Sequence, residues 1–168
     1  MKLITTITAA LLLTANTLSH AMENKITVKQ VSLSGTTGVN MGTVSFENSR
    51  YGLLIKPHLS GLTPGLHGFH VHINPSCADN GSAAGGHLDP AHTNKHLGPF
   101  NPNGHLGDLP ALYVANDGTA TQTMIAPRLQ LSDLQNHSIM IHAGGDNYSD
   151  EPAKLGGGGS RFACGVVR

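Results

Sequence analysis

Six histidines and one aspartate carry most of the chemistry that this sequence could perform. Imidazole nitrogens and a carboxylate oxygen are common ligands of zinc and copper, and seven such groups can hold two metal ions rather than one. Histidine is also over-represented, with eleven copies against three tyrosines and no tryptophan. The sequence therefore predicts a two-metal site with redox chemistry. Its candidate ligands are His70, His72, His87, His96, His105, Asp108 and His142.

Four of these candidates lie in one segment and follow the pattern H-x8-H-x8-H-x2-D. They are His87, His96, His105 and Asp108. Three nitrogens and one oxygen suit a tetrahedral zinc ion, and four protein ligands would make this site closed and structural. His92 lies inside the same segment, but the spacing is complete without it, so we predict that it does not bind metal.

The second group begins with His70 and His72, which alternate with Phe69, Val71 and Ile73. Because successive side chains of a strand point to opposite faces, the three apolar residues should face the core. The two imidazoles should then project outward together. His142 ends the apolar run 139–141 and should likewise point away from the core.

Three imidazoles from His70, His72 and His142 would suit copper, but they also fit a catalytic zinc ion. A fourth nitrogen decides between these alternatives, since a tetragonal set of four nitrogens favours copper. An imidazolate can ligate two cations through its two nitrogens. His87, the first histidine of the loop set, is our candidate for this bridge.

The elements that must position these ligands are predicted to be β-strands. Eight short runs are β-branched or alternating and are separated by Gly, Asn, Asp and Pro. No segment predicts a helix, and 21 glycines favour tight turns, including a hairpin turn at 116–118. The expected class is all-β, either sandwich or barrel. The runs are 25–33, with a bulge near Gln30, and then 42–47, 51–59, 68–74, 111–115, 119–125, 138–142 and 163–167.

Two long segments, 75–110 and 143–162, lack strand periodicity. Loops of this length in a compact domain are usually functional. Because 75–110 contains the loop ligands, we expect the metal chemistry in loops that are held against a rigid β scaffold.

The first 21 residues have the features of a secretory signal peptide: Lys2, an apolar run and small residues before the expected cleavage site. The apolar run is too short and too interrupted for a membrane anchor. A single domain is expected at 22–168. Ten basic and ten acidic side chains balance, so nothing indicates a nucleic-acid partner.

Only two cysteines, Cys77 and Cys164, are present. In an exported protein one intrachain disulfide is expected. The alternative is that both are metal ligands, but neither belongs to a closely spaced cysteine pair of the kind that binds zinc.

Several motifs resemble those of the copper/zinc superoxide dismutases in their exported bacterial form. The resemblance covers nearly the whole mature chain and implies an eight-stranded, immunoglobulin-like Greek-key barrel or sandwich. Its two long loops would be a metal-binding loop and an electrostatic loop. The motifs are GFHVH at 68–72, GGHLDP at 85–90, HLGDLP at 105–110, HAGGDN at 142–147 and GSRFACGV at 159–166.

The resemblance also implies a role for each site residue. Copper would be held by His70, His72, His87 and His142, and zinc by His87, His96, His105 and Asp108. Asp146 would accept hydrogen bonds from one ligand of each metal, namely His70 and His96. Arg161 would hold the anionic substrate beside the copper channel. The Cys77–Cys164 disulfide would tie the first loop to the last strand.

The implied activity is the dismutation of superoxide to dioxygen and hydrogen peroxide in the periplasm, with copper and zinc as cofactors. A homodimer is expected by resemblance, although the stretch between Cys77 and Gly85 is shorter than in many exported relatives. The charges of 143–162 single out no steering lysine, since Lys154 and Arg161 are accompanied by three acidic residues.

Two other classes of function fit the sequence less well. A periplasmic copper or zinc buffer on the same scaffold would bind metal without turnover, but the complete ligand set and Arg161 argue against it. A hydrolytic zinc enzyme would need an open zinc position beside a general base such as glutamate, and 75–110 contains no glutamate.

Overall fold

A computed structural model describes residues 24–30 and 38–168 of the chain. The predicted signal peptide at 1–21 lies outside the described residues, as do Val31 and Leu33 of the first predicted strand. In the described part, no helix has the length and apolar character needed to cross a bilayer.

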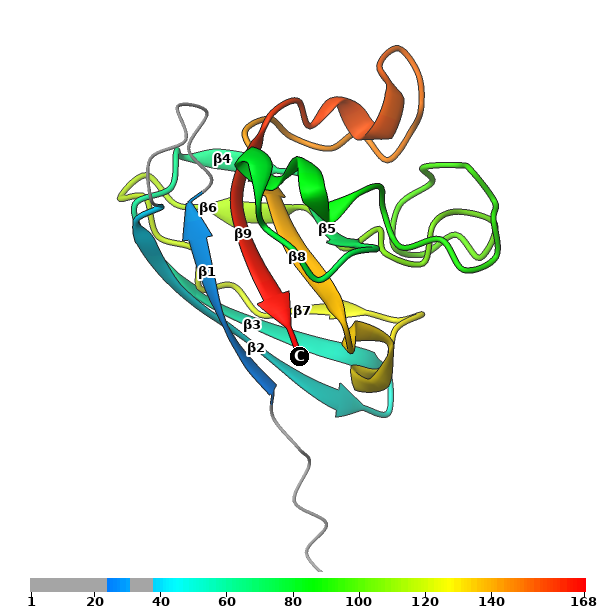
Figure 1. The fold of residues 1–168 in the computed structure, drawn as a ribbon, viewed down its shortest axis with the longest axis horizontal. Coiled ribbons are helices and arrows are strands. Elements are labelled where there is room, and N and C mark those ends of the chain that lie inside the picture. The colour runs from blue at the N-terminus through cyan, green and yellow to red at the C-terminus, as the bar shows by residue number, and fades with distance from the viewer. Residues whose placement is uncertain (1–23, 31–37) are drawn as a thin grey trace, which may run out of the picture.

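The described residues form an antiparallel β fold, which confirms the all-β prediction (Figure 1). One sheet has seven strands in the order β5-β8-β9-β1-β2-β3-β7, and β4 pairs with β6 separately. The neighbours β9–β1 and β3–β7 are not consecutive in the chain, as is usual in Greek-key folds. The strands are β1 (Asn24–Gln30), β2 (Asn40–Ser49), β3 (Gly52–Leu59), β4 (Gly65–His67), β5 (Phe69–His72), β6 (Leu112–Val114), β7 (Met124–Ala126), β8 (His137–His142) and β9 (Arg161–Val167).

Most strand boundaries shift by one to three residues from the predicted runs, and two differences are larger. A short strand, β4, precedes β5, and Gly68 separates the two because its N–H donates to Gly144 O outside the sheet. Of the run 119–125, only its end belongs to β7, while Ala120 forms an isolated bridge with Leu59. Three short 3-10 helices also occur where we predicted no helix: η1 (Asp79–Ala84), η2 (Leu131–Leu134) and η3 (Lys154–Gly157).

Local irregularities match the glycine and turn signals of the sequence. The register of β1 against β2 shifts between Val28 and Lys29, where Met41 of β2 is skipped. The irregularity therefore lies close to the predicted position near Gln30, but the extra residue belongs to β2, whereas we had predicted it in the first strand. At 116–118 the chain turns as expected, with Gly118 at a φ of +80° and its N–H donating to Ala115 O.

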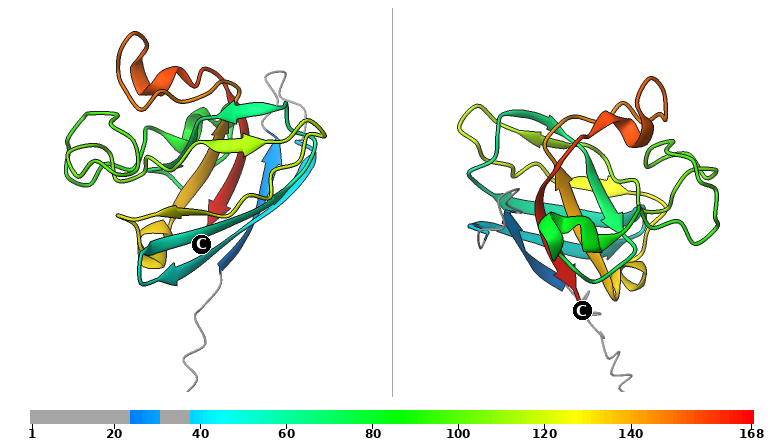
Figure 2. Two further views of the ribbon diagram at one scale, coloured as in Figure 1. Left: turned by 180° about the vertical axis from the view of Figure 1, so that it is seen from behind. Right: turned by 45° about the horizontal axis from the view of Figure 1, so that its top comes forward.

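The core lies on the inner face of the curved sheet. Packing against this core determines which side chains of the ligand-bearing strands point inward. Phe69 and Val71 of β5 are fully buried in it, as are Ile139 and Ile141 of β8. Ile73 was predicted to join them but is 44% exposed, because β5 ends at His72 and Ile73 N–H bonds to Gly86 O in the loop. The long loops around η1 and η3 lie at the same end of the strands (Figures 1 and 2).

Candidate metal centre

The four histidines predicted for copper converge on one point. His70 and His72 come from β5, His142 ends β8, and His87 comes from the first long loop. One nitrogen from each lies within 4.8 Å of the others, and all four residues are buried. The alternation of β5 and β8 causes this convergence, because the apolar neighbours of these histidines occupy the core on the opposite face.

The unpaired nitrogens of these histidines fit a metal ion. Within the described residues, His70 Nδ1 and the Nε2 atoms of His72, His87 and His142 are buried without a hydrogen-bond partner. Buried polar atoms are nearly always paired, so four such nitrogens facing one point indicate a cation site. The donor set of four imidazoles suits copper.

The remaining ring nitrogens of three of these ligands are held by hydrogen bonds that orient the rings. His70 Nε2 lies 2.8 Å from Asp146 Oδ2, and His72 Nδ1 lies 2.9 Å from Gly85 O. His142 Nδ1 lies 3.2 Å from Gly159 O. Because a carbonyl or carboxylate only accepts, each of these nitrogens must carry the proton, and the opposite nitrogen keeps its lone pair for a metal.

The predicted zinc ligands form a second buried group beside the first. Asp108 Oδ1 lies 3.0 Å from Nδ1 of His87, 3.0 Å from Nδ1 of His96 and 3.3 Å from Nδ1 of His105. Asp108 Oδ2 accepts from the N–H groups of Leu97 and Gly98, which fixes the carboxylate. Three Nδ1 atoms around one carboxylate oxygen provide the donors of a tetrahedral zinc site.

His87 belongs to both groups. Its Nδ1 faces Asp108 in the second group, whereas its Nε2 is unpaired in the first. The ring centroid lies 3.9 Å from that of His70 and 5.3 Å from that of His105. A single imidazole therefore separates the two groups with one nitrogen directed to each.

Asp146 links the two groups from the electrostatic loop, which ends at residue 160 rather than at the predicted 162 because β9 begins at Arg161. Its Oδ2 accepts from His70 at 2.8 Å and its Oδ1 from His96 at 2.7 Å. Burial raises the pKa of the Asp146 carboxyl, but hydrogen bonds from His70 and His96 outweigh this and hold the pKa below its usual value. The carboxylate therefore stays ionised and accepts from both rings.

The electrostatics of the site favour neutral imidazoles in the first group. Burial, with repulsion from His87, lowers the pKa of His70 to about 3 and that of His72 to about 2. Burial also lowers the pKa of His142 to about 4. In His96, burial is outweighed by the carboxylates of Asp108 and Asp146, which raise its pKa to about 9. The first group is therefore uncharged at neutral pH, as copper ligands must be.

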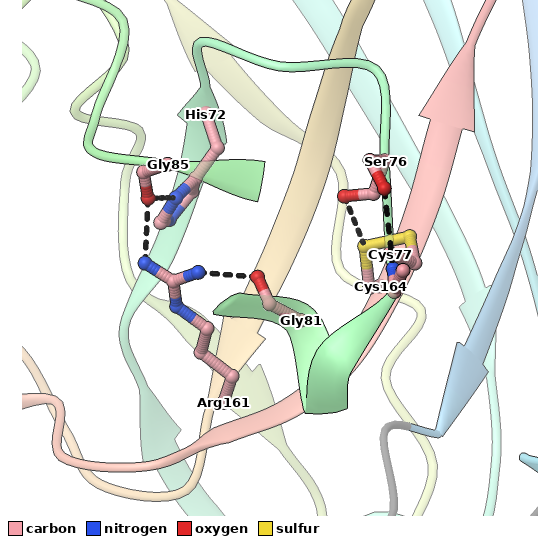
Figure 3. Close-up of a disulfide and its surroundings, with 8 residues drawn as sticks. His72, Ser76, Cys77, Gly81, Gly85, Arg161 and Cys164 are labelled. Carbon is pink, nitrogen blue, oxygen red and sulfur yellow. Dashed lines mark hydrogen bonds between the residues drawn. A yellow bond between two sulfur atoms is a disulfide. The ribbon is translucent and has the colours of Figure 1, made fainter. Parts of the chain in front are cut away.

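Arg161, at the start of β9, lies beside the first group (Figure 3). Its guanidinium donates to Gly81 O and, at 2.5 Å, to Gly85 O. Gly85 O is also the acceptor for the copper-side histidine His72. One carbonyl therefore fixes a ligand ring and a cationic side chain relative to each other.

The Cys77–Cys164 disulfide forms as predicted and attaches this loop to β9. The two cysteines are 87 residues apart in sequence, and their Cα atoms are 5.8 Å apart. Met140, Ala84 and Cys164 pack together beneath it in a small second apolar cluster. The disulfide therefore anchors the loop whose carbonyls hold Arg161 (Figure 3).

Other histidines and lysines occupy different positions. His67 is buried, and its ring nitrogens face His142 O and Thr63 O, each at 2.7 Å. His92 is exposed and belongs to neither group. Lys154 and His105 line the same pocket of about 400 Å³.

Two features near the site, the Gly85 carbonyl and the Arg128 side chain, were not predicted from the sequence. A carbonyl that accepts from two side chains has no sequence signature. Arg128 donates to carbonyls of the loop that carries the second group, but it lies outside the histidine segments. It also matches none of the motifs that carry the resemblance.

Comparisons with known proteins agree with this geometry. A family model described as copper/zinc superoxide dismutase matches residues 40–167. The chain is 57% identical to superoxide dismutase [Cu-Zn] 1 of Salmonella typhimurium over 159 residues, which is 89% of this chain and 90% of the relative. It is 52% identical to superoxide dismutase [Cu-Zn] of Photobacterium leiognathi over 160 residues, 90% of this chain and 91% of the relative.

Solved structures show the same similarity. The Cu/Zn superoxide dismutase from Brucella abortus superimposes with a TM-score of 0.83 at 46% identity, covering 88% of this chain and 100% of that chain. The monomeric copper, zinc superoxide dismutase from Salmonella enterica gives a TM-score of 0.76 at 49% identity, with the same coverage.

Proposed function

Because the chain belongs to the copper/zinc superoxide dismutase family and dismutes superoxide to dioxygen and hydrogen peroxide, we propose which of its residues carry that activity. Copper is assigned to His70, His72, His87 and His142. Zinc is assigned to His87, His96, His105 and Asp108. The observation that carries this assignment is the ring of His87, which directs one nitrogen to each buried group.

Bound copper supplies one-electron redox chemistry, and bound zinc fixes the loop ligands and the orientation of His87. The protein contributes a proton at a defined atom. In our proposal, Nε2 of His87 alternates between a ligand lone pair and an N–H group. That N–H donates one of the two protons that hydrogen peroxide needs, and water supplies the other.

Arg161 binds the substrate anion. Its carbonyl contacts with Gly81 and Gly85 fix the guanidinium next to His72, while the charge remains uncompensated by any carboxylate contact within the described residues. A fixed positive charge with several donors attracts and orients a small anion. Burial lowers the pKa of Arg161, but a guanidinium remains charged at neutral pH.

The test compares metal content and superoxide decay for the purified mature protein, His87→Ala and Arg161→Ala. We expect His87→Ala to lose the coupled metal site and activity. Arg161→Ala should keep both metals and lose about tenfold or more in kcat/KM, in line with typical electrostatic rate effects. Full dismutase activity in His87→Ala would exclude the shared-imidazole assignment.

The metal-buffer alternative predicts binding without turnover. The relatives are superoxide dismutases, and this chain has complete ligand groups, so we do not favour that alternative.

We further propose export to the periplasm, with cleavage after residue 21 and a mature domain at 22–168. The relatives are bacterial proteins, and the first 21 residues have the composition of a signal peptide. Cell fractionation followed by N-terminal sequencing tests this. A cytoplasmic protein that retains Met1 would contradict it.

A homodimer is also proposed, through the outer face of the β4–β6 pair. Leu66 and Tyr113 are paired across these strands and are 58% and 49% exposed. Adjacent exposed apolar side chains favour a self-complementary contact. Sedimentation at micromolar concentration should show a dimer for the wild type and a monomer for Leu66→Glu. A monomeric wild type, as for the Salmonella enterica relative, would refute the proposal.

A further inference from the structure

Arg128 makes an unusual set of contacts with the loop that carries two of the proposed zinc ligands. It lies two residues after the end of β7, between Ala126 and Leu129 in the chain, and both of these residues are buried in the core. From this position the Arg128 side chain extends to residues 98–105, more than twenty positions earlier in the chain.

Its guanidinium donates to four backbone carbonyls. Nε donates to Pro99 O at 2.9 Å, Nη1 to Gly104 O at 3.2 Å and Nη2 to Gly98 O at 3.3 Å. Nη2 also donates to the carbonyl of His105, a proposed zinc ligand. These carbonyls lie near the two ends of the chain segment between His96 and His105, so the Arg128 side chain connects both ends.

Other contacts show that this junction is continuous with the zinc ligands. The N–H of Gly98 donates to Asp108 Oδ2, while the carbonyl of Gly98 accepts from Arg128. His105 N–H donates to Lys95 O at 2.9 Å, next to His96. Each end of this segment therefore contacts both Arg128 and a ligand residue.

We propose that Arg128 is a positioning residue for zinc: it sets the separation of His96 and His105, and of Asp108 from both, before the metal binds. This inference rests on the zinc assignment proposed above. A guanidinium suits the task because its five N–H donors lie in one rigid plane, which a lysine ammonium cannot reproduce. Burial lowers the pKa of Arg128 and the nearby Asp108 opposes this in part, but a guanidinium remains charged at neutral pH.

Selectivity between the two metals distinguishes this role from a general structural one. Three of the four proposed copper ligands, His70, His72 and His142, lie on β5 and β8, and among the described residues none of them has a hydrogen bond to Arg128. Only the fourth, His87, also belongs to the zinc group. Weakened positioning of the 96–105 loop should therefore reduce zinc affinity much more than copper affinity.

The experiment uses the full mature protein, stripped of metal, with Arg128→Lys and the control Arg50→Lys. Arg50 is exposed at the β2–β3 turn and its guanidinium lies over the Tyr51 ring, far from the ligands in sequence. Zinc affinity is measured by competition with a chromophoric chelator, copper affinity in the same way, and the geometry of the zinc site by the visible absorption of Co²⁺.

In Arg128→Lys we expect zinc affinity to fall about 10- to 100-fold, the range seen for residues that orient metal ligands, with altered Co²⁺ bands. Copper affinity should change less than about threefold, and Arg50→Lys should match the wild type. If Arg128→Lys does not fold, Arg128→Gln takes its place with the same expectation.

Zinc affinity within twofold of the wild type and unchanged Co²⁺ bands, in a folded Arg128 variant, would overturn the proposal. Equal loss of zinc and copper affinity would also overturn it, because that result indicates general destabilisation. His105→Ala separates the two inferences: if it binds zinc as tightly as the wild type, the zinc assignment itself fails, whatever Arg128 does.

Discussion

Single side chains in this protein serve two partners at once, and Asp146 is the clearest case. Each carboxylate oxygen accepts from a ring of a different ligand group, His70 or His96. The His87 ring likewise belongs to both ligand groups. Substitution at such residues should therefore affect both metals together.

Asp146→Asn tests this at the residue scale. An asparagine has one acceptor oxygen, and its amide N–H₂ would face a ring N–H of His70 or His96. We expect the ring that faces the amide nitrogen to lose its orientation. The affinity for the metal that this ring binds should fall by about 10- to 100-fold, and the affinity for the other metal should also fall. Competition titrations with zinc and copper measure this.

Asp117→Asn is the matched control, because Asp117 caps an exposed turn through Thr119 and an asparagine oxygen can accept the same bonds. Affinities that agree between Asp146→Asn and Asp117→Asn would show that Asp146 does not orient the ligands.

At the scale of elements, the electrostatic loop reaches the site because a glycine lets the backbone approach it. Gly156 has a φ of +75°, and a Cβ placed there would clash with Asp146 Oδ1 and lie 2.8 Å from His96 Nε2. Gly156→Ala should therefore displace Asp146, weaken metal binding and lower the free energy of unfolding.

Gly157→Ala is the control for backbone strain alone. Gly157 has a φ of +73°, but a Cβ added to it would meet only Ala153 Cβ, at 3.7 Å, which is an ordinary van der Waals contact. We expect both variants to lose about 1 kcal/mol from the positive φ, and Gly156→Ala alone to lose metal affinity by chelator competition. Equal metal affinities in the two variants would refute the steric explanation.

The disulfide acts on a second element, the loop around η1. Replacing both Cys77 and Cys164 by serine opens a ring that spans 87 residues of sequence separation. In the chain-entropy model such a ring contributes roughly 4–5 kcal/mol to stability. Urea unfolding should show a loss of this order, and kcat/KM should fall as Gly81 and Gly85 release Arg161. A loss below about 1 kcal/mol would contradict the chain-entropy explanation.

The strands were predictable from the sequence where one face is apolar. Phe69, Val71, Ile139 and Ile141 define the core face, and the ligand histidines follow from the alternation. The prediction for Ile73 was wrong because periodicity does not show where a strand ends. The loops were recognised by their length and their ligands, but contacts such as Gly85 O to Arg161 depend on backbone groups that every residue has.

At the scale of the whole molecule, the charge state of the buried histidines couples metal binding to folding. The pKa values of His70, His72 and His142 are lowered to about 3, 2 and 4 from 6.5, chiefly by burial. His96 opposes them, because carboxylates raise its pKa to about 9 despite burial. Burial also lowers the pKa of His87, so four lowered groups against one raised group make the balance pH-dependent.

The stability of the metal-free protein should therefore fall with acid. A histidine with a lowered pKa stabilises the fold above its unfolded pKa, here 6.5, and loses that contribution as the pH falls toward 4, 3 and 2. His96 contributes stability below pH 6.5 and loses it as the pH rises through about 9. Below pH 6.5 the unfolded chain therefore binds more protons, and acid favours unfolding.

Urea unfolding of metal-free protein between pH 7.5 and 4.5 measures this slope, with His72→Gln as the matched variant. Glutamine cannot take up the proton that His72 takes up on unfolding, so the acid slope should become shallower by about 1.4 kcal/mol per pH unit. An equal slope in the two proteins would show that His72 does not contribute. A wild-type protein that becomes more stable on acidification would contradict the predicted sign. That sign follows from imidazoles that are buried and neutral in the folded state, which is also the state in which they can bind metal.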